Sequence, residues 1–292
     1  MSDKGTMIEL HADPTRLTTL APLYPRTLLG PDNPALIVGP CASEAQSLLA
    51  DATGLHLPLG PDAPFASAET LAANALALGH AGDNALLRRL HYLEFLRDAD
   101  YPREGYRLFS VHNVLCVLGR SPEALSAGVS RLINQLKQLD GQWALPGKLI
   151  LSDPAPDTGD PTALLDTLKT LTPAKTGWPS EFLQALDKLR EAGEERWARA
   201  FIDLITPYAT GQIPLSFWLM SAVDFWTDRL ANGWQAVEDL PFFTDAERLL
   251  VTNLVLAATQ YCHDSITYQK WRITDEEHMI FNHHTFPATS LF

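Results

Sequence analysis

The sequence is poor in cysteine and has no long apolar run, and both absences restrict what the chain can be. Cys41, Cys116 and Cys262 are the only cysteines in 292 residues, and no CxxC pair occurs. They are interpreted as small buried apolar residues rather than as disulfide partners or zinc ligands. No window approaches the roughly 18–20 uncharged apolar residues that a membrane-spanning helix requires, so no membrane partner is expected.

A secretory signal and a basic charge excess are also missing. The first residues lack the apolar stretch of a signal peptide, which predicts a cytoplasmic chain as written, or a periplasmic or secreted one if a leader is missing. The formal net charge is −13. Non-specific nucleic-acid binding depends on neutralising phosphates, so no nucleic-acid partner is expected. No HExxH spacing, glycine-rich phosphate loop or GxSxG elbow occurs, which predicts neither a metal nor a cofactor.

The first half of the sequence alternates strand and helix patterns, as expected for an α+β chain of about two domains. A short apolar run at residues 35–39 predicts a buried strand, and residues 106–111 and 114–118 are two further candidate strands. Helix starts are indicated by Asn84 and by Ser121 before Pro122, and a capping box by Ser43 with Gln46. An arm over residues 1–29 and a small α/β domain of ferredoxin-like type over residues 30–151 are therefore predicted.

The strand signals end at a segment rich in proline and aspartate, residues 152–162, which is typical of a linker. After it, Thr244 with Glu247 forms a capping-box pattern. Helical periodicity covers residues 164–171, 180–192, 194–208, 216–232, 245–264 and 276–281. These segments, joined by short turns, predict an all-helical domain over residues 163–292, either a bundle or an incomplete (α/α) toroid.

Two stretches of the first half carry a family resemblance. Residues 113–136 contain a strand that ends in Gly-Arg-Ser-Pro, followed by a helix with the small residue Gly128 toward the sheet. With residues 35–59, this pattern resembles the small α/β domain that precedes the catalytic domain in α-glucuronidases, β-hexosaminidases and several polysaccharide lyases. The resemblance implies an accessory domain without catalytic residues.

The second half carries another resemblance. Asn282-His283, followed by His284, resembles the Asn-His element of heparinase II/III-like and alginate-type lyases, and residues 233–262 resemble helix pairs of their (α/α) toroids. The resemblance implies a polysaccharide lyase that cleaves uronic-acid-containing glycans by β-elimination.

That chemistry needs donors that neutralise the uronate carboxylate and a base that removes the C5 proton. Asn282 and His283 match the neutralising and catalytic positions. Tyr261, His263 and Tyr268 are the nearest candidates for the base, and their spacing does not select among them.

Tryptophan is frequent in the second half, at positions 197, 218, 226, 234 and 271. A flat aromatic ring covers the C–H face of a sugar, so a glycan groove lined by tryptophan is expected. The expected substrate-binding residues are His284, Trp218, Trp226 and Trp271. The expected partner is a polysaccharide, and the sequence leaves its identity and the oligomeric state open.

Two alternatives remain at this point. A glycoside hydrolase with an (α/α) barrel needs two carboxyl groups that flank one bond. The candidates are Asp224, Asp228, Glu238, Asp239, Glu276 and Glu277. The other alternative is a non-catalytic carbohydrate-binding or scaffold fragment. Because the sequence ends on the apolar stretch 286–292, we expect it to be the N-terminal part of a longer enzyme, and inactive by itself.

Overall fold

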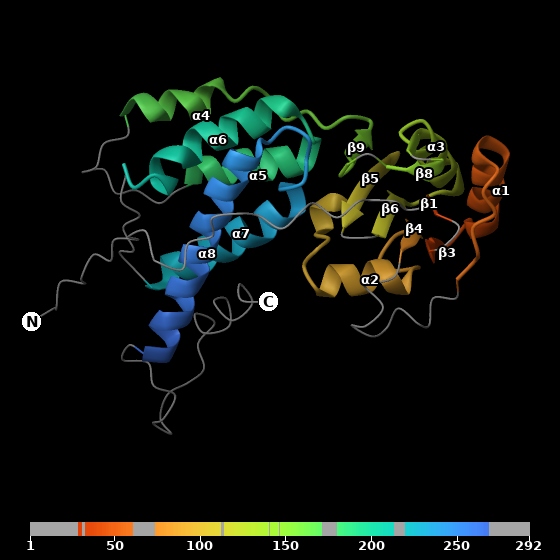
Figure 1. Ribbon diagram of the computed structural model, residues 1–292, viewed down its shortest axis with the longest axis horizontal. Helices are drawn as coiled ribbons and strands as arrows, with labels where there is room; N and C mark the ends of the chain where they lie inside the picture. Colours follow the sequence, from red (N-terminus) through yellow and green to blue (C-terminus); the bar gives the residue numbers. More distant parts are fainter. Residues whose placement is uncertain are drawn as a thin grey trace, which may run out of the picture.

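The computed structural model describes residues 29–30, 33–60, 74–111, 114–139, 141–145, 147–170, 180–212 and 220–268 (Figure 1). The described chain is mixed α+β, with a five-stranded main sheet, a smaller four-stranded sheet and eight α-helices. Within it the strands all lie before residue 154, and only helices follow from residue 162. The predicted α+β class and the order of strands before helices are confirmed.

The main sheet is mixed, with strand order β3-β4-β6-β5-β9. Its strands are β3 (Leu36–Val38), β4 (Ala75–Gly79), β5 (Tyr106–Val111), β6 (Val114–Gly119) and β9 (Ile150–Asp153). β3, β4 and β6 are parallel, and β5 pairs antiparallel with both β6 and β9. Every residue of β4, β5 and β6 is buried. Strands buried along their whole length are typical of a sheet that is covered on both faces.

Helices cover both faces of the main sheet. Successive strand residues point to opposite sides, so neighbours in one strand belong to different cores. Leu108 belongs to the core under α1 (Ala42–Thr53) and α3 (Pro122–Ile133), whereas Phe109 belongs to the core shared with α2 (Ala85–Tyr92). Gly128 of α3 lies against this sheet, where an added Cβ would come within 2.5 Å of Val117 Cγ1. The sequence-based expectation of a small residue on this side of the helix is confirmed.

The predicted helix starts are confirmed at Asn84, Ser121 and Thr244, but the prediction at Ser43 is wrong. Asn84 accepts hydrogen bonds from the first-turn amides of α2 and donates to carbonyls of β3 and β4. α1 instead begins one residue before Ser43, and its N-cap, Cys41, has a left-handed backbone and no side-chain cap. Gln46 is not available for a capping box, because its amide donates to the carbonyl of Leu57.

A second, smaller sheet was not predicted. It has the order β2-β1-β8-β7 and consists of β1 (Leu29–Gly30), β2 (Asn33–Pro34), β7 (Lys137–Leu139) and β8 (Gln142–Ala144). Strands of two or three residues are too short to show an alternating pattern. The ferredoxin-like form is not confirmed, since the main sheet is built in the order β-α-β-α-β-β-α-β, with one more strand–helix unit than β-α-β-β-α-β.

The second half is helical throughout its described residues. It contains α4 (Thr162–Asp166), the 3₁₀ turn η4 (Thr167–Thr170), α5 (Ser180–Ala192), α6 (Glu195–Ala209), α7 (Met220–Val237) and α8 (Asp245–Tyr268). The last four pack in the closed order α5–α6–α8–α7. This arrangement is a four-helix group, and the predicted toroid is not confirmed. The predicted helix at residues 276–281 lies outside the described residues.

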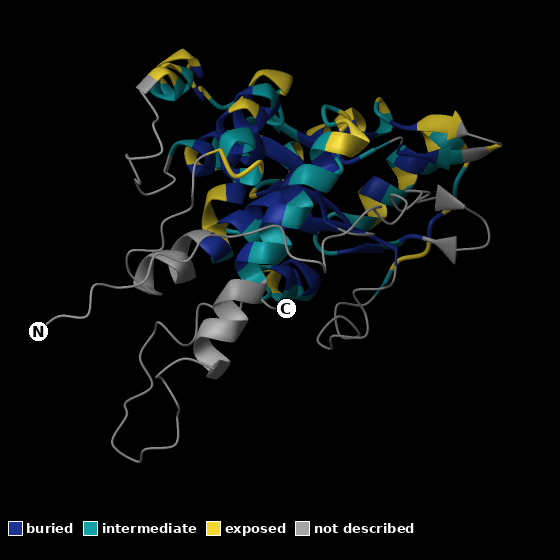
Figure 2. Ribbon diagram, turned by 60° about the vertical axis from the view of Figure 1, so that its left-hand side comes forward, coloured by how far each residue is buried: buried dark blue, intermediate teal, exposed yellow. Residues whose placement is uncertain are grey.

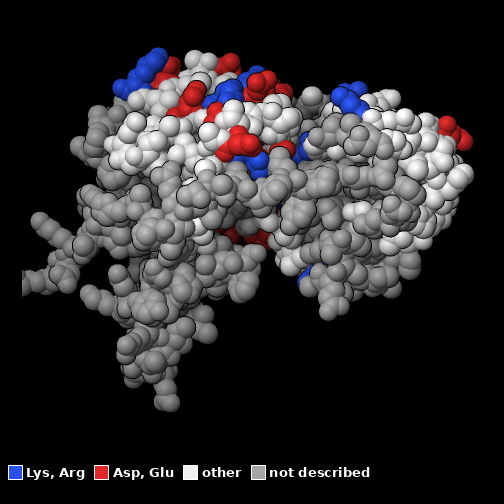
Figure 3. Space-filling model, in the orientation of Figure 1, with Lys and Arg blue, Asp and Glu red and all other residues white. Residues whose placement is uncertain are grey.

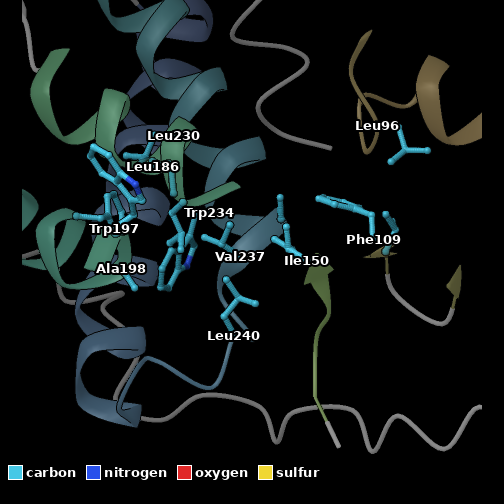
Figure 4. Packing of buried hydrophobic residues seen from close by; sticks show 14 of the residues in the cluster. Leu96, Phe109, Ile150, Leu186, Trp197, Ala198, Leu230, Trp234, Val237 and Leu240 are labelled. Carbon is cyan, nitrogen blue, oxygen red and sulfur yellow. The ribbon is translucent and has the colours of Figure 1, made fainter. Parts of the chain in front are cut away.

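One hydrophobic core joins the main sheet to the helices. Phe109 and Ile150 of the sheet belong to the same buried cluster as Leu186, Trp234 and Val237 of α5 and α7 (Figure 4). Both the sheet and the helices that share this core contain buried residues, which are dark blue in Figure 2. The division into a domain over residues 30–151, a linker and a helical domain stays a prediction.

The segment after β9 is attached to the helices. Thr158, in the stretch predicted as a linker, is buried and accepts a hydrogen bond of 2.9 Å from Trp197 Nε1 of α6. At the end of α5, Gly193 lies so close to β9 that an added Cβ would be 2.3 Å from the carbonyl oxygen of Ile150. The helical part therefore has close contacts with both β9 and the residues that follow it.

Candidate functional site

Most of the residues predicted to act on a glycan lie outside the described part of the chain. These are Asn282, His283, His284, Trp218 and Trp271. The helix positions of the others are known: Trp226 lies in the first half of α7, and Tyr261, His263 and Tyr268 lie in the second half of α8.

Trp226 of α7 and the candidate bases of α8 lie toward the same end of the α7–α8 hairpin. Near its turn, Trp234 Nε1 of α7 donates a hydrogen bond of 3.1 Å to Thr252 Oγ1 of α8. In an antiparallel hairpin, the earlier residues of α7 and the later residues of α8 both lie at the end opposite the turn. Trp226 and Tyr261 are therefore at the end away from the turn. Tyr261 and Tyr268 are two helical turns apart and share a helix face.

Two of the five tryptophans, Trp197 and Trp234, are core residues. The prediction that the tryptophans line a sugar-binding groove is therefore wrong for these two. Trp197 and Trp234 are each only 2% exposed. Trp234 packs against Phe201 and Phe243, with ring centroids 5.8 and 5.1 Å away. Both indole N–H groups donate to threonine hydroxyls. A single-sequence pattern does not distinguish a buried tryptophan from one that lines a groove.

A polar seam lies where α5 and α7 meet the loop after α2. We define the seam by its six residues, which come from three segments: Glu94, Arg97, Asp187, Asp228, Arg229 and Asn232. Figure 3 shows acidic and basic side chains gathered on the helical part and toward its boundary with the sheet. Ligand sites are common where separate parts of a fold meet, which makes the seam a candidate.

Two carboxylates of the seam share one amide. Asn232 Nδ2 is 3.1 Å from Glu94 Oε2 and 3.0 Å from Asp228 Oδ1. Those two oxygens are therefore at most 6.1 Å apart. Glu94 has a positive φ of 61°, a conformation that is uncommon outside glycine and that is enriched at functional sites. The arrangement holds two acids from distant segments side by side.

The rest of the seam is an ion-pair chain. Asp187 of α5 lies between Arg97, whose Nη1 is 3.4 Å from Asp187 Oδ1, and Arg229, whose Nη2 bonds the other oxygen. Partial burial, followed by the nearby charge of Arg190, lowers the pKa of Arg97, while Asp187 opposes that shift. These ion pairs connect α5 with α7 and with the loop after α2.

Sequence analysis included Asp228 among the candidate acids but missed its partners Glu94 and Asn232. The strands β5 to β9 and the helices α3 to α6 lie between residues 94 and 228 in the chain, and no local pattern marks the pair. The positive φ of Glu94 follows the end of α2, where a glycine or asparagine would have been the recognisable signal.

No group of acids, histidines and cysteines in the described chain is arranged to hold a metal ion. None of the described helices is both long and apolar enough to cross a membrane. No protein-family model, curated protein or solved structure matches the chain.

Proposed function

We propose that the protein is a carbohydrate-active enzyme, a polysaccharide lyase that cleaves uronic-acid-containing glycans by β-elimination. The observation that supports it most is the α7–α8 hairpin, which has Trp226 and the candidate bases Tyr261 and Tyr268 toward one end. The strand-then-helix order of the chain is also what an accessory α/β layer before an (α/α) toroid requires. The ferredoxin-like and toroid forms belong to this proposal.

The proposed reaction uses Asn282 and His283 to hold and neutralise the uronate carboxylate, which makes the C5 proton more acidic. Tyr261 or Tyr268 removes that proton, the C4–O bond breaks and a C4=C5 double bond forms. The tyrosine then returns the proton to the departing glycosidic oxygen. Thirteen residues lie between Tyr268, at the end of α8, and Asn282, and this length of chain allows Asn282 to lie near that end of the hairpin.

Binding distinguishes this proposal from a general affinity for polysaccharide. The protein is expected to bind alginate or polygalacturonate in titration calorimetry and not a neutral glucan, since Asn282 and His283 recognise the carboxylate. With a net charge of −13, non-specific attraction to a polyanion is not expected. Equal binding of neutral and acidic glycans, or no binding of either, would contradict the proposal.

A glycoside hydrolase is the second candidate, and the Glu94–Asn232–Asp228 arrangement favours it. Retaining hydrolases hold two carboxyl groups about 5–5.5 Å apart, a spacing that the upper limit of 6.1 Å permits. In such an enzyme one acid would attack the anomeric carbon and the other would protonate the leaving oxygen.

Substitution of the two acids separates the two candidates. If the protein is a hydrolase, Glu94→Gln and Asp228→Asn each remove reducing-end release from a glycan. If it is a lyase, both variants keep the wild-type rate of unsaturated uronate formation. Asp203→Asn, at an exposed position of α6, is the matched control. Binding without either product would indicate the non-catalytic alternative, a carbohydrate-binding or scaffold protein.

A further inference from the structure

A cluster of three buried charges lies beside the seam, where α5 meets the main sheet. Asp100 of the 3₁₀ turn η3 (Asp98–Asp100), Arg107 of β5 and Arg190 of α5 are 3%, 4% and 3% exposed. Asp100 Oδ2 is 2.6 Å from Arg190 Nη2, and Asp100 Oδ1 is 3.3 Å from Arg107 Nη2. One carboxylate therefore connects an arginine of the sheet to an arginine of the helical part.

The two arginines are held close together by more than this carboxylate. Arg107 Nη2 also donates to the backbone carbonyl of Arg190, and Arg190 Nη2 donates to the carbonyl of Phe95 at 3.0 Å. Both guanidinium carbons lie over the ring of Phe109, at 5.2 and 5.4 Å from its centroid. Two cations of different segments thus share one small, buried site.

The charges in the cluster do not cancel. One carboxylate faces two guanidinium groups, and Arg107 Nε and Arg190 Nη1 are buried without a hydrogen-bond partner within the described chain. Removing one member of a buried ionic group leaves uncompensated charge and is strongly unfavourable. Without Asp100, two like charges would face each other across the contact between β5 and α5.

We propose that Asp100 is an electrostatic latch: its negative charge holds α5 and the helices packed on it against the main sheet, and its neutralisation opens this contact. The core on the other face of the sheet, under α1 and α3, is formed by separate residues. Opening therefore leaves that face intact. A latch at this position also controls the seam, since the amide of Arg97 donates to Asp100 Oδ2 at 2.8 Å.

The direction of the pH dependence follows from the groups that interact with Asp100, which are Arg190 from α5, Arg107 from β5, the amide and guanidinium of Arg97, the neighbouring Tyr101 and Cys116 from β6. Burial raises the pKa of Asp100, but the charges of Arg190 and Arg107 outweigh burial and hold the pKa below its ordinary value. A carboxylate with a lowered pKa stabilises the fold above its unfolded-state pKa, and this stabilisation is lost as pH falls through the folded-state pKa. The latch is closed at neutral pH and opens only in acid.

The test is amide hydrogen exchange on the Asp100→Asn variant at neutral pH. Faster exchange is expected in η3, in β5 and in α5, with unchanged protection in α1 and α3. The melting temperature is expected to fall by about 10 °C. Asp98→Asn, at an exposed position of the same 3₁₀ turn, is the matched control and is expected to behave as the wild type.

A second variant separates the effect of the charges from the effect of side-chain packing. Replacing all three members with apolar residues, Asp100→Leu with Arg107→Met and Arg190→Met, removes the repulsion as well as the attraction. This variant is expected to regain wild-type protection in α5, because apolar replacement of a whole buried ionic group is often neutral or stabilising. The proposal is overturned by wild-type exchange in Asp100→Asn, by equal loss of protection in α1 and α3, or by a triple variant that stays open.

Discussion

Replacement of Asn282 by alanine is expected to lower kcat of the full-length protein on a uronate polysaccharide by about 10²–10³-fold. The side-chain amide is proposed to bind the uronate carboxylate, and to bind it more strongly as negative charge develops on that group when the C5 proton leaves. The part of the interaction that strengthens in the transition state lowers kcat, and the part already made in the bound substrate raises KM. Initial rates of unsaturated uronate formation, followed by ultraviolet absorbance over a range of glycan concentrations, measure both quantities.

The control for this variant is Asn134→Ala, which removes an exposed asparagine at the end of α3. It is expected to keep the wild-type rate, and both variants should have the wild-type circular dichroism spectrum and melting temperature. Full activity of Asn282→Ala would remove Asn282 from the proposed mechanism. A change in KM alone would give it a role in binding rather than in the reaction.

Replacement of Trp234 by alanine is expected to lower the free energy of unfolding by about 3–5 kcal/mol. The indole is 2% exposed, lies against Phe201 and Phe243 and also donates a hydrogen bond to Thr252. Its removal leaves a cavity in the core that joins the sheet to the helices (Figure 4). Urea denaturation followed by circular dichroism gives the change as a shift of the midpoint at constant slope.

Tyr92→Ala is the comparison for this variant, since Tyr92 is also aromatic but 73% exposed. Its effect on the free energy of unfolding is expected to stay within about 0.5 kcal/mol. If Trp234→Ala instead kept wild-type stability and lost glycan affinity, Trp234 would be a groove residue and its assignment to the core would be wrong.

The parts of the fold that could be predicted from the sequence are those encoded by neighbouring residues. Asn84 and Ser121 cap their helices with their own side chains, and Thr244 with Glu247 forms the expected capping box. β5 and β6 were expected as strands from their own residues, and every residue of both is buried. For the helix caps, the deciding interaction lies within a few residues of the signal.

The parts that could not be predicted depend on residues far apart in the chain. Asp100 meets Arg190, and Glu94 meets Asn232, only after the helices have packed on the sheet. The register of a two-residue strand such as β1 depends on its partner β8 rather than on its own sequence. The cap at Ser43 failed for a similar reason, because Gln46 bonds to Leu57 in another segment.

Product analysis in water enriched in heavy oxygen tests the proposed function most directly. The full-length protein is incubated with alginate or polygalacturonate, and the oligosaccharides are examined by mass spectrometry. β-Elimination predicts unsaturated products that are lighter by one water than hydrolysis products and contain no heavy oxygen. Saturated products that carry heavy oxygen at the new reducing end would contradict the lyase and would point to hydrolysis at Glu94 and Asp228.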